Sequence, residues 1–488
     1  MTIDAAPDLR LLLGVTIAVY VAVMYALAFW AQGRIHDTED FLVAGRRLPL
    51  SLAWATLLAT WFGAGTLLAS TDEVRRAGLE RAALEPFGAG FCLIIAGLFF
   101  AKPLWSMGLL TLSDFFRRRF GPRAELLSAL IMVPTYFGWV AAQFVALAGV
   151  LELFFGMDLR LGILLVALVG VGYTLLGGMW SVTLTDAVQI GLVLVGLVYL
   201  GLTALAGLAD GNAWLGFLRL LRETPPEMLR PIPTESARAL FGWISLFLVG
   251  ALGNIPGQDL TQRIFASRSA TVARRACILA GCAYVSFGLI PVTLGLVARI
   301  AIPGSVDRAV LPALAQLFLT PTGAVIFTVA VISAVLSTID SAILSPASVL
   351  AQNVFERVNR GRIASLTLNR VAVVIVAAAS LGMAYMGESA YSLLEDAYEL
   401  PLVGLFVPLT LGLYGRPRGQ SPAVASMAVG GSLWLLHYFS GWEDFLGPWA
   451  EPFGVSVPVA LGGTACSLVA YVLVNRSLRP VEATTPQA

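Results

Sequence analysis

Long apolar runs separated by short polar segments are the main feature of this sequence. Each run has about 20 residues, the length that an α-helix needs to cross ~30 Å of hydrocarbon. The pattern therefore predicts an all-α integral membrane protein with about 13 transmembrane helices. The predicted spans are 10–32, 50–71, 86–109, 126–154, 160–179, 185–207, 240–260, 276–301, 322–349, 365–386, 392–414, 421–440 and 456–475.

Composition agrees with this class of protein. Hydrophobic residues make up 58% of the 488 residues and charged residues 12%, and the mean hydropathy is +0.83, far from soluble averages. The first run is too long for a signal-peptide core, so we expect a permanent extra helix at 10–32. Because only loops separate the runs, residues 1–488 are expected to form a single membrane domain.

Arginine residues crowd alternate loops, which predicts the orientation in the membrane. Such loops lie on the cytoplasmic side by the positive-inside rule. With 13 spans, the N-terminus is then outside and the tail 476–488 is cytoplasmic. We expect a multi-pass protein of the plasma membrane, of the bacterial inner-membrane type. The loops concerned contain Arg46–Arg47, Arg117–Arg119, Arg263–Arg275, Arg357–Arg362 and Arg416–Arg418.

The chain offers little for enzyme chemistry. All four cysteines fall within predicted spans, where a free thiol behaves as a small apolar group. His36 and His437 have no nearby cysteine or carboxylate cluster, which disfavours a zinc site or a catalytic triad. We therefore expect a protein that is not an enzyme, that lies in membrane lipid and that binds no nucleic acid.

Two predicted spans are interrupted by small residues. Gly63 and Gly65 flank Ala64 in the second span, where each glycine costs helix roughly 1 kcal/mol relative to alanine. Gly253 and Gly257 interrupt the seventh span, five spans later. In transporters built from inverted repeats, a pair of broken helices marks the binding site, because freed carbonyls can face an ion. The alternative is close packing of neighbouring helices.

The ninth span is unusually polar. Hydroxyl and carboxylate oxygens are ligands that suit a hard cation such as Na⁺, although Ser and Thr in a helix usually bond their own carbonyls. Asp340 is either a functional intramembrane acid or an ordinary residue near the cytoplasmic end. The polar positions are Ser333, Ser337, Thr338, Asp340, Ser341 and Ser345.

Asp186 lies about one turn inside the helix that follows the short loop in GGMWSVTLTDAVQ, 177–189. It is either an N-terminal dipole partner or a stop on the inner exit path of a cation.

Six sequence blocks in order resemble the sodium:solute symporter family over almost the whole chain. They are DFLVAGRRLP, ATWFGAGT, TLSDFFRRRFG, YTLLGGMWSVTLTDAVQ, GQDLTQRIFASRSATVARR and AVLSTIDSAIL, between residues 40 and 344. The resemblance implies a LeuT-like fold of two inverted five-helix repeats with broken first and sixth core helices. The repeats would occupy 50–207 and 240–414, followed by two additional helices at 421–475.

The resemblance also implies a site for Na⁺ as the coupling ion. In the family, Na⁺ is held by carbonyls of the broken first core helix and by carbonyl and hydroxyl groups of the eighth. The matching positions here are Ala59, Phe62, Ala334, Ser337 and Thr338. Asp186 matches a family acid that is linked to Na⁺ affinity and inward release, and we place Asp340 on the same ion path.

Within the family, ATWFGAG, GLFFAKPLWSMG and LGNIPGQDLTQR are most similar to the high-affinity choline transporters, which hold a quaternary ammonium in an aromatic cage. Trp61 and Trp139 match two cage positions. Two others are lost: the tyrosine position is Ala89, with Phe91 nearby, and a tryptophan position is Gly257. The substrate-binding candidates are Trp61, Gly63, Phe91, Trp139, Gly253 and Gly257.

These observations predict a symporter that couples Na⁺ entry to uptake of a small organic solute by alternating access. Choline or a related ammonium compound is one candidate solute. An amino acid or a monocarboxylate is the alternative, and a solute receptor that does not transport could have the same fold. The small or apolar side chains at the positions that bind sugar hydroxyls in sugar transporters disfavour a sugar.

Overall fold

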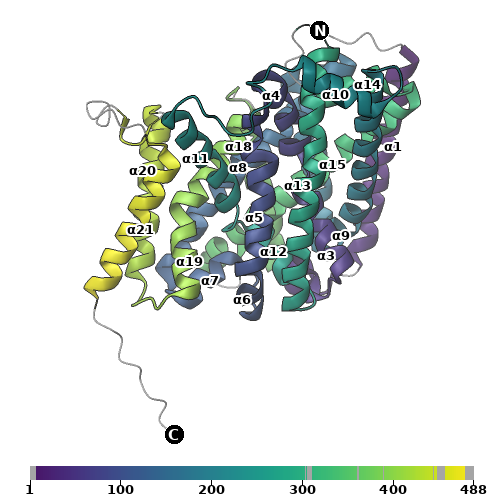
Figure 1. Cartoon of the computed structure of the whole chain (residues 1–488). Coiled ribbons are helices and arrows are strands. Elements are labelled where there is room, and N and C mark those ends of the chain that lie inside the picture. The colour runs from purple at the N-terminus through teal and green to yellow at the C-terminus, as the bar shows by residue number, and fades with distance from the viewer. Residues whose placement is uncertain are drawn as a thin grey trace.

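The structure of the protein is a computed structural model that describes residues 7–33, 35–302, 304, 310–359, 362–387, 390–442, 444–447 and 457–478. The described residues form helices connected by short loops, with no β-strand among them (Figure 1). Of the predicted tail 476–488, residues 479–488 lie outside the described part.

The first half of the chain contains the helices α1 (Pro7–Gln32), α2 (Thr38–Val43), η1 (Ala44–Arg46), α3 (Leu50–Trp61), η2 (Gly65–Ala69), α4 (Ser70–Ala77), η3 (Leu79–Ala83), η4 (Leu84–Gly88), α5 (Ala89–Ile95), η5 (Ala96–Phe100), α6 (Ala101–Ser106), α7 (Leu112–Arg119), α8 (Pro122–Phe155), α9 (Leu159–Gly207) and α10 (Ala213–Glu223).

The second half contains α11 (Ala237–Gly253), α12 (Gln258–Ala266), α13 (Ala270–Ala301), α14 (Val310–Phe318), α15 (Pro321–Val349), η6 (Leu350–Phe355), α16 (Glu356–Asn359), α17 (Ser365–Ala384), α18 (Ala390–Pro401), η7 (Leu402–Phe406), α19 (Val407–Tyr414), α20 (Ser421–Ser440) and α21 (Val459–Ser477).

The described helices include ten that are long and apolar enough to cross a membrane, or eleven if α3 and the bent segment after it form one span. The sequence predicts about 13 spans. The two others, 160–179 and 421–440, are helical as well. The apolar part of the first is the shorter Leu159–Gly172, and the second is α20, which is not among the ten. The all-α membrane class is confirmed.

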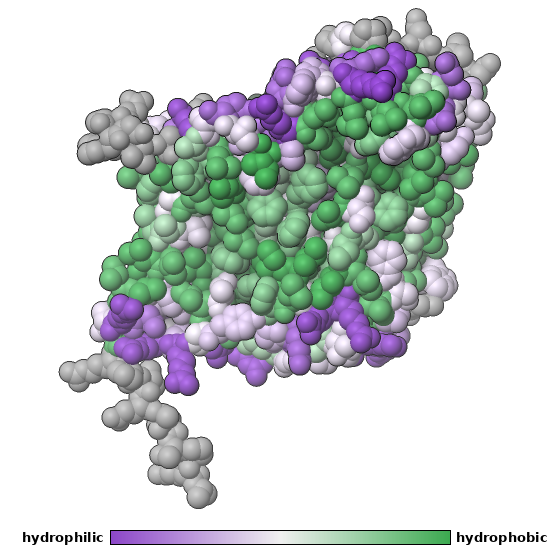
Figure 2. Space-filling model, viewed as in Figure 1, coloured by the Kyte–Doolittle hydropathy of each residue, from purple (hydrophilic) through white to green (hydrophobic). Residues whose placement is uncertain are grey.

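The surface has the layout of a membrane protein. Figure 2 shows a broad hydrophobic belt between two hydrophilic rims. In an 18-residue window of α1, 11% of the residues are buried, whereas 78% are buried in the corresponding window of α15. The N-terminal helix α1 therefore lies at the outside of the bundle and α15 lies in its centre. Helices α20 and α21 pack together at the edge opposite α1 (Figure 1).

Both interruptions predicted from the glycine pattern are real breaks. The axis bends by 52° between α3 and the segment Gly65–Ala77. The seventh predicted span ends as α11 at Gly253 and resumes as α12 at Gln258. A third kink lies inside α9 at Gly178, whose φ of 60° favours glycine. It separates the two spans that the sequence places on either side of residues 180–184.

Candidate functional site

The break after α3 changes the partners of the main chain. In a continuous helix the Gly63 N–H would donate to the Ala59 carbonyl, but it donates to the Trp61 carbonyl at 2.8 Å. The Ala64 N–H donates to Gln143 Oε1 at 2.8 Å in place of the Thr60 carbonyl. The last turn of α3 therefore presents carbonyl oxygens that have lost their helical donors.

Helix α15 lies directly against this break. Thr338 Oγ1 is 3.3 Å from the Thr60 carbonyl oxygen and 3.1 Å from the Ala334 carbonyl oxygen, and it can donate to one of them at a time. A Cβ atom added at Gly63 would lie 2.6 Å from Thr338 Oγ1 and 2.9 Å from Gln143 Oε1. Only glycine lets α15 come this close.

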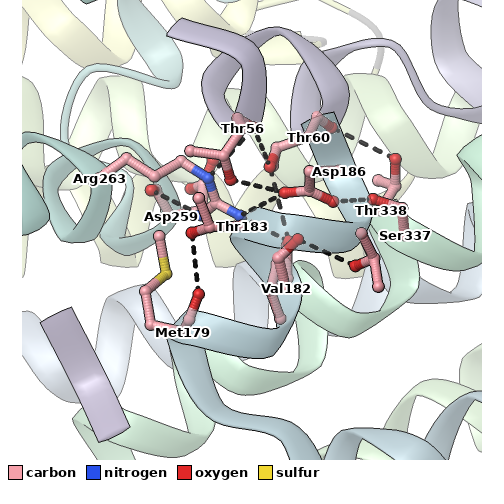
Figure 3. A network of polar contacts seen from close by, with 12 residues as sticks. Thr56, Thr60, Met179, Val182, Thr183, Asp186, Asp259, Arg263, Ser337 and Thr338 are labelled. Atoms are coloured by element: carbon pink, nitrogen blue, oxygen red, sulfur yellow. Dashed lines mark hydrogen bonds and ion pairs between the residues drawn. The ribbon is translucent and has the colours of Figure 1, made fainter. Parts of the chain in front are cut away.

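Asp186 joins three helices at the same place (Figure 3). Thr56 Oγ1 of α3 donates to Asp186 Oδ2 at 2.5 Å, and the Ser337 hydroxyl of α15 donates to Asp186 Oδ1. The side chain of Asp186, on the part of α9 that follows the Gly178 kink, is fully buried. Asp186 therefore does more than stabilise a helix N-terminus, because it fixes hydroxyls on two neighbouring helices.

Arg263 of α12 brings a buried positive charge to this cluster. Its Nη2 atom lies 4.0 Å from Asp186 Oδ2 and donates to Ser341 Oγ at 2.6 Å. Nη1 donates to the Asp259 carbonyl at 3.0 Å, and Nε donates to the Thr56 carbonyl at 3.4 Å. The guanidinium thus connects both helix breaks to α15.

Asp340 is buried and faces α9. The Thr174 hydroxyl donates to Asp340 Oδ1, and 5% of the residue is exposed. The same hydroxyl lies 2.7 Å from the Gly170 carbonyl. Of the two readings left by the sequence, the structure places Asp340 inside the bundle, one turn of α15 beyond Ser337.

A small cavity lies beside the break between α11 and α12. It is bounded by α8, α18 and the segment that connects α11 to α12. Its volume is about 20 Å³, enough for one water-sized group. Three of the predicted substrate residues, Trp139, Gly253 and Gly257, line it. The other lining residues are Met132, Thr135, Tyr136, Asn254, Pro256, Asp259, Ala397, Tyr398 and Pro401.

The lining of this cavity includes one carboxylate and several aromatic rings. Tyr136 OH donates to Asp259 Oδ1 at 2.6 Å and accepts from the Asp259 N–H at 3.0 Å. The rings of Tyr136 and Trp139 are 5.7 Å apart between centroids. A Cβ atom at Gly257 would lie 2.7 Å from Asp259 Oδ1, so the absent side chain leaves the space that this carboxylate occupies.

A second buried carboxylate, Glu85, lies close to the break after α3. Thr66 Oγ1 donates to Glu85 Oε2 at 2.9 Å, Tyr398 OH donates to Oε1 at 3.1 Å, and Tyr284 OH contacts Oε2. Tyr284 OH is also 3.0 Å from the Trp61 carbonyl. Glu85 is 2% exposed, so it is a buried acid held only by hydroxyl groups among the hydrogen bonds of the described residues.

The remaining predicted substrate residues lie outside the cavity. Trp61 is buried at the end of α3, and Gly63 faces Thr338 and Gln143. Phe91 is 43% exposed on the membrane-facing surface and packs edge-on against Phe247. The structure therefore brings Trp139, Gly253 and Gly257 together and leaves Phe91 apart from them.

Several residues of the site were not singled out from the sequence. Asp259 and Arg263 lie in the block GQDLTQR, which carries part of the family resemblance. The arginine pattern places Arg263 in a cytoplasmic loop, which is wrong: it is 1% exposed, within α12. The sequence pattern predicts a third span from residue 86 and so leaves Glu85 in a loop, whereas the span in the structure begins at Leu79. The rule that an ionisable residue within a span is a functional candidate would have pointed to Asp259, which falls inside the predicted span 240–260.

Known proteins share both the sequence and the architecture. A family model described as sodium:solute symporter family matches residues 41–430. The human high affinity choline transporter 1 is 28% identical over 459 residues, which cover 88% of this chain and 77% of that protein. A sodium/glucose cotransporter of Vibrio parahaemolyticus is 23% identical over 454 residues and covers 84% and 82%.

A solved structure extends the likeness to the whole fold. A Na⁺-coupled sialic acid symporter in a substrate-bound outward-open state superposes with a TM-score of 0.79, covering 98% of this chain and 99% of that one at 17% identity. The predicted LeuT-like fold with broken first and sixth core helices is thereby confirmed. With more than half of its length matched by the family model, the chain belongs to the sodium:solute symporter family.

Proposed function

We propose that this Na⁺-coupled symporter takes up a small organic ammonium compound, a class suggested by its similarity to the human high affinity choline transporter 1. The observation that carries the proposal is the cavity beside the break between α11 and α12. It combines a buried carboxylate, Asp259, with the rings of Tyr136 and Trp139. A carboxylate and aromatic faces both attract an organic cation.

The charge balance of the interior supports a cationic solute. The buried residues around the two helix breaks and α15 include four carboxylates but one guanidinium, counted over the described chain. Ionised acids in a membrane interior need positive charge nearby. Na⁺ and a cationic solute would both supply it. The residues are Glu85, Asp186, Asp259, Asp340 and Arg263.

For the coupling ion we propose the oxygens of Ala59, Phe62, Ala334, Ser337 and Thr338. The Ser337 hydroxyl donates a hydrogen bond to Asp186, so the lone pairs of its oxygen remain for a cation. The carboxylate makes that oxygen a better ligand by polarising the O–H bond, as partners of metal ligands do. Asp186 thus acts on Na⁺ through Ser337.

On this account Asp186 and Asp340 lie along the ion path. Arg263 lies 4.0 Å from Asp186. When its charge does not offset that of Asp186, the carboxylate would strengthen the bond between the Ser337 hydroxyl and the ion. A shift of Arg263 toward Asp186 would weaken the hold on Ser337 and favour release. Asp340 lies one helical turn beyond Ser337 on α15 and accepts a hydrogen bond from Thr174 of α9. It would meet the ion next.

For the solute we propose Trp139, Gly253 and Gly257 as direct contacts. Trp61 and Gly63 would shape the break after α3. Phe91 is not part of this proposal, because it packs against Phe247 on the outer surface. The cavity holds only a water-sized group, so a larger solute enters after the helices around it move apart, as alternating access requires.

The arrangement in the membrane follows the same reasoning. We propose that residues 50–207 and 240–414 form the two inverted repeats, with 10–32 before them and 421–475 after them. The protein would lie in a bacterial inner membrane with the N-terminus outside and the C-terminus inside. The end of α21 and the helix α10 lie on opposite faces (Figure 1), which agrees with this orientation.

Counterflow in proteoliposomes tests the proposed function. Vesicles loaded with unlabelled choline and ethanolamine should accumulate either labelled compound when Na⁺ is present and should not when K⁺ replaces it. A receptor that only binds would show Na⁺-dependent binding without accumulation. Exchange of an amino acid or a monocarboxylate, with neither ammonium compound accepted, would favour the alternative solutes.

A further inference from the structure

We infer that Asp259 and Asn254 select a protonated amine that carries an N–H bond and a nearby oxygen atom, in preference to a quaternary ammonium compound. The inference rests on the proposed function, because it specifies the solute class of the same cavity. Two polar groups of the cavity carry it. Within the described residues, the Asp259 carboxylate has no salt bridge within 4.0 Å, and the Asn254 side-chain amide has no hydrogen-bond partner for its Nδ2 atom.

The carboxylate of Asp259 is available to a ligand. Only one of its contacts comes from another side chain, the hydroxyl of Tyr136 at 2.6 Å. Arg263 bonds the Asp259 backbone carbonyl at 3.0 Å, lies 4.0 Å from Asp186, and interacts with the Asp259 carboxylate only at longer range. No salt bridge within 4.0 Å joins the Asp259 carboxylate to an arginine or lysine in the described part of the chain. An ammonium N–H would add a direct, charge-assisted hydrogen bond to this carboxylate.

The unpaired donor is the side-chain amide of Asn254. Its Nδ2 atom is buried and has no hydrogen-bond partner among the described residues, and Asn254 lines the same cavity. A buried unsatisfied donor costs about 1–3 kcal/mol, so a ligand that supplies an acceptor oxygen gains that amount of binding. A hydroxyl or a carboxyl oxygen of the solute would meet this need.

The lost cage aromatics favour the same class. A trimethylammonium group has no N–H for the Asp259 carboxylate, and a cage that lacks two of its aromatic residues attracts such a group less. At Gly257, one of these two positions, the space of the absent side chain is taken by the Asp259 carboxylate.

A structural role for Asp259 is the competing explanation. The residue lies in the first turn of α12, where an acid interacts favourably with the helix dipole. That role affects stability and is indifferent to the methylation state of a solute. Selectivity among amines therefore separates the two explanations.

The experiment uses the full-length protein in detergent with ethanolamine, its N-methyl and N,N-dimethyl derivatives, and choline. Binding is measured by competition against a labelled amine at saturating Na⁺. We expect affinity to fall at least about tenfold at the last methylation step, where the N–H is lost. Glycine in place of ethanolamine distinguishes a carboxyl oxygen from a hydroxyl oxygen as the partner of Asn254.

Asp259→Asn should abolish the preference for ethanolamine over choline while Na⁺ still raises the melting temperature as in the wild type. If this variant does not fold, Tyr136→Phe, which removes the hydroxyl partner, and Asn254→Ala are measured in the same way. Asn254→Ala should weaken ethanolamine about tenfold and leave propylamine, which has no oxygen, unchanged. Asp158→Asn, an exposed acid at the start of α9, is the control.

Equal affinity for choline and ethanolamine, or a preference that persists in Asp259→Asn, would overturn the inference and leave the proposed function intact. Failure of all four compounds to bind with Na⁺ would instead overturn the proposed function itself.

Discussion

At the scale of single residues, the account depends on hydroxyl and carboxylate oxygens that meet across helices. Ser337 and Asp186 were both selected from the sequence, and the structure joins them by a hydrogen bond. Arg263 is the buried charge on which this group depends, because its guanidinium lies 4.0 Å from Asp186 and bonds Ser341 at 2.6 Å. Removing one member of a buried charge pair costs more than removing both.

Arg263→Met should therefore lower the unfolding free energy by about 3–5 kcal/mol. The double variant Arg263→Met with Asp186→Asn should recover part of that loss, since the acid then carries no charge. Thermal unfolding in detergent measures both. Arg222→Met, on the exposed face of α10, should change the melting temperature little. A double variant no more stable than Arg263→Met alone would show that the two charges do not compensate each other.

The sequence identified these residues unevenly, for physical reasons. Ser337, Thr338 and Asp186 were recognisable because oxygen-bearing side chains are rare and costly within apolar runs. The contacts of Glu85 with Thr66, Tyr284 and Tyr398 join segments up to 313 positions apart, and no local pattern encodes such a meeting. The partners of buried acids thus required the three-dimensional structure.

At the scale of helices, the break after α3 is the element that matters most. A glycine run in an apolar span can mean a break or close packing, and at Gly63 both are present. The chain bends by 52° there, and Thr338 packs where a Cβ would lie. The second break, between Gly253 and Gln258, was predicted from the same signal. Helix limits were predicted less well, as the early start of the third span at Leu79 illustrates.

Gly63→Ala should abolish Na⁺-dependent uptake. A Cβ at this position would be 2.6 Å from Thr338 Oγ1, so α15 would have to move away from the end of α3. Uptake is measured in proteoliposomes, with protein yield as the check on folding.

Gly382→Ala is the matched control for this change. Gly382 also lies within a membrane helix, α17, and a Cβ there would meet nothing within 4 Å. Its uptake should equal that of the wild type. Normal uptake by Gly63→Ala would mean that the contact with α15 is not needed for coupling.

At the scale of the whole molecule, the arginine pattern predicts the orientation in the membrane. The segment 208–238 between the sixth and seventh predicted spans, which includes α10, would face the outside, and the loops rich in arginine would face the cytoplasm. The hydrophobic belt between two polar rims (Figure 2) shows where the membrane lies and leaves the direction to be measured.

Cysteine labelling measures that direction. In a variant without its four native cysteines, Glu227→Cys should react with a membrane-impermeant maleimide on intact cells. Arg123→Cys, at the start of α8, should react only after permeabilisation. The reverse pattern would invert the proposed topology without affecting the assignment of the ion site.

Direct binding of radiolabelled Na⁺ to purified protein tests the central claim, that the coupling ion binds between the end of α3 and the hydroxyls of α15. Ser337→Ala and Thr338→Ala should each weaken Na⁺ binding roughly tenfold or more. Ser286→Ala and Thr293→Ala should bind as the wild type, because these hydroxyls bond the carbonyl four residues earlier in α13 and are exposed. Wild-type Na⁺ affinity in both α15 variants would contradict the account.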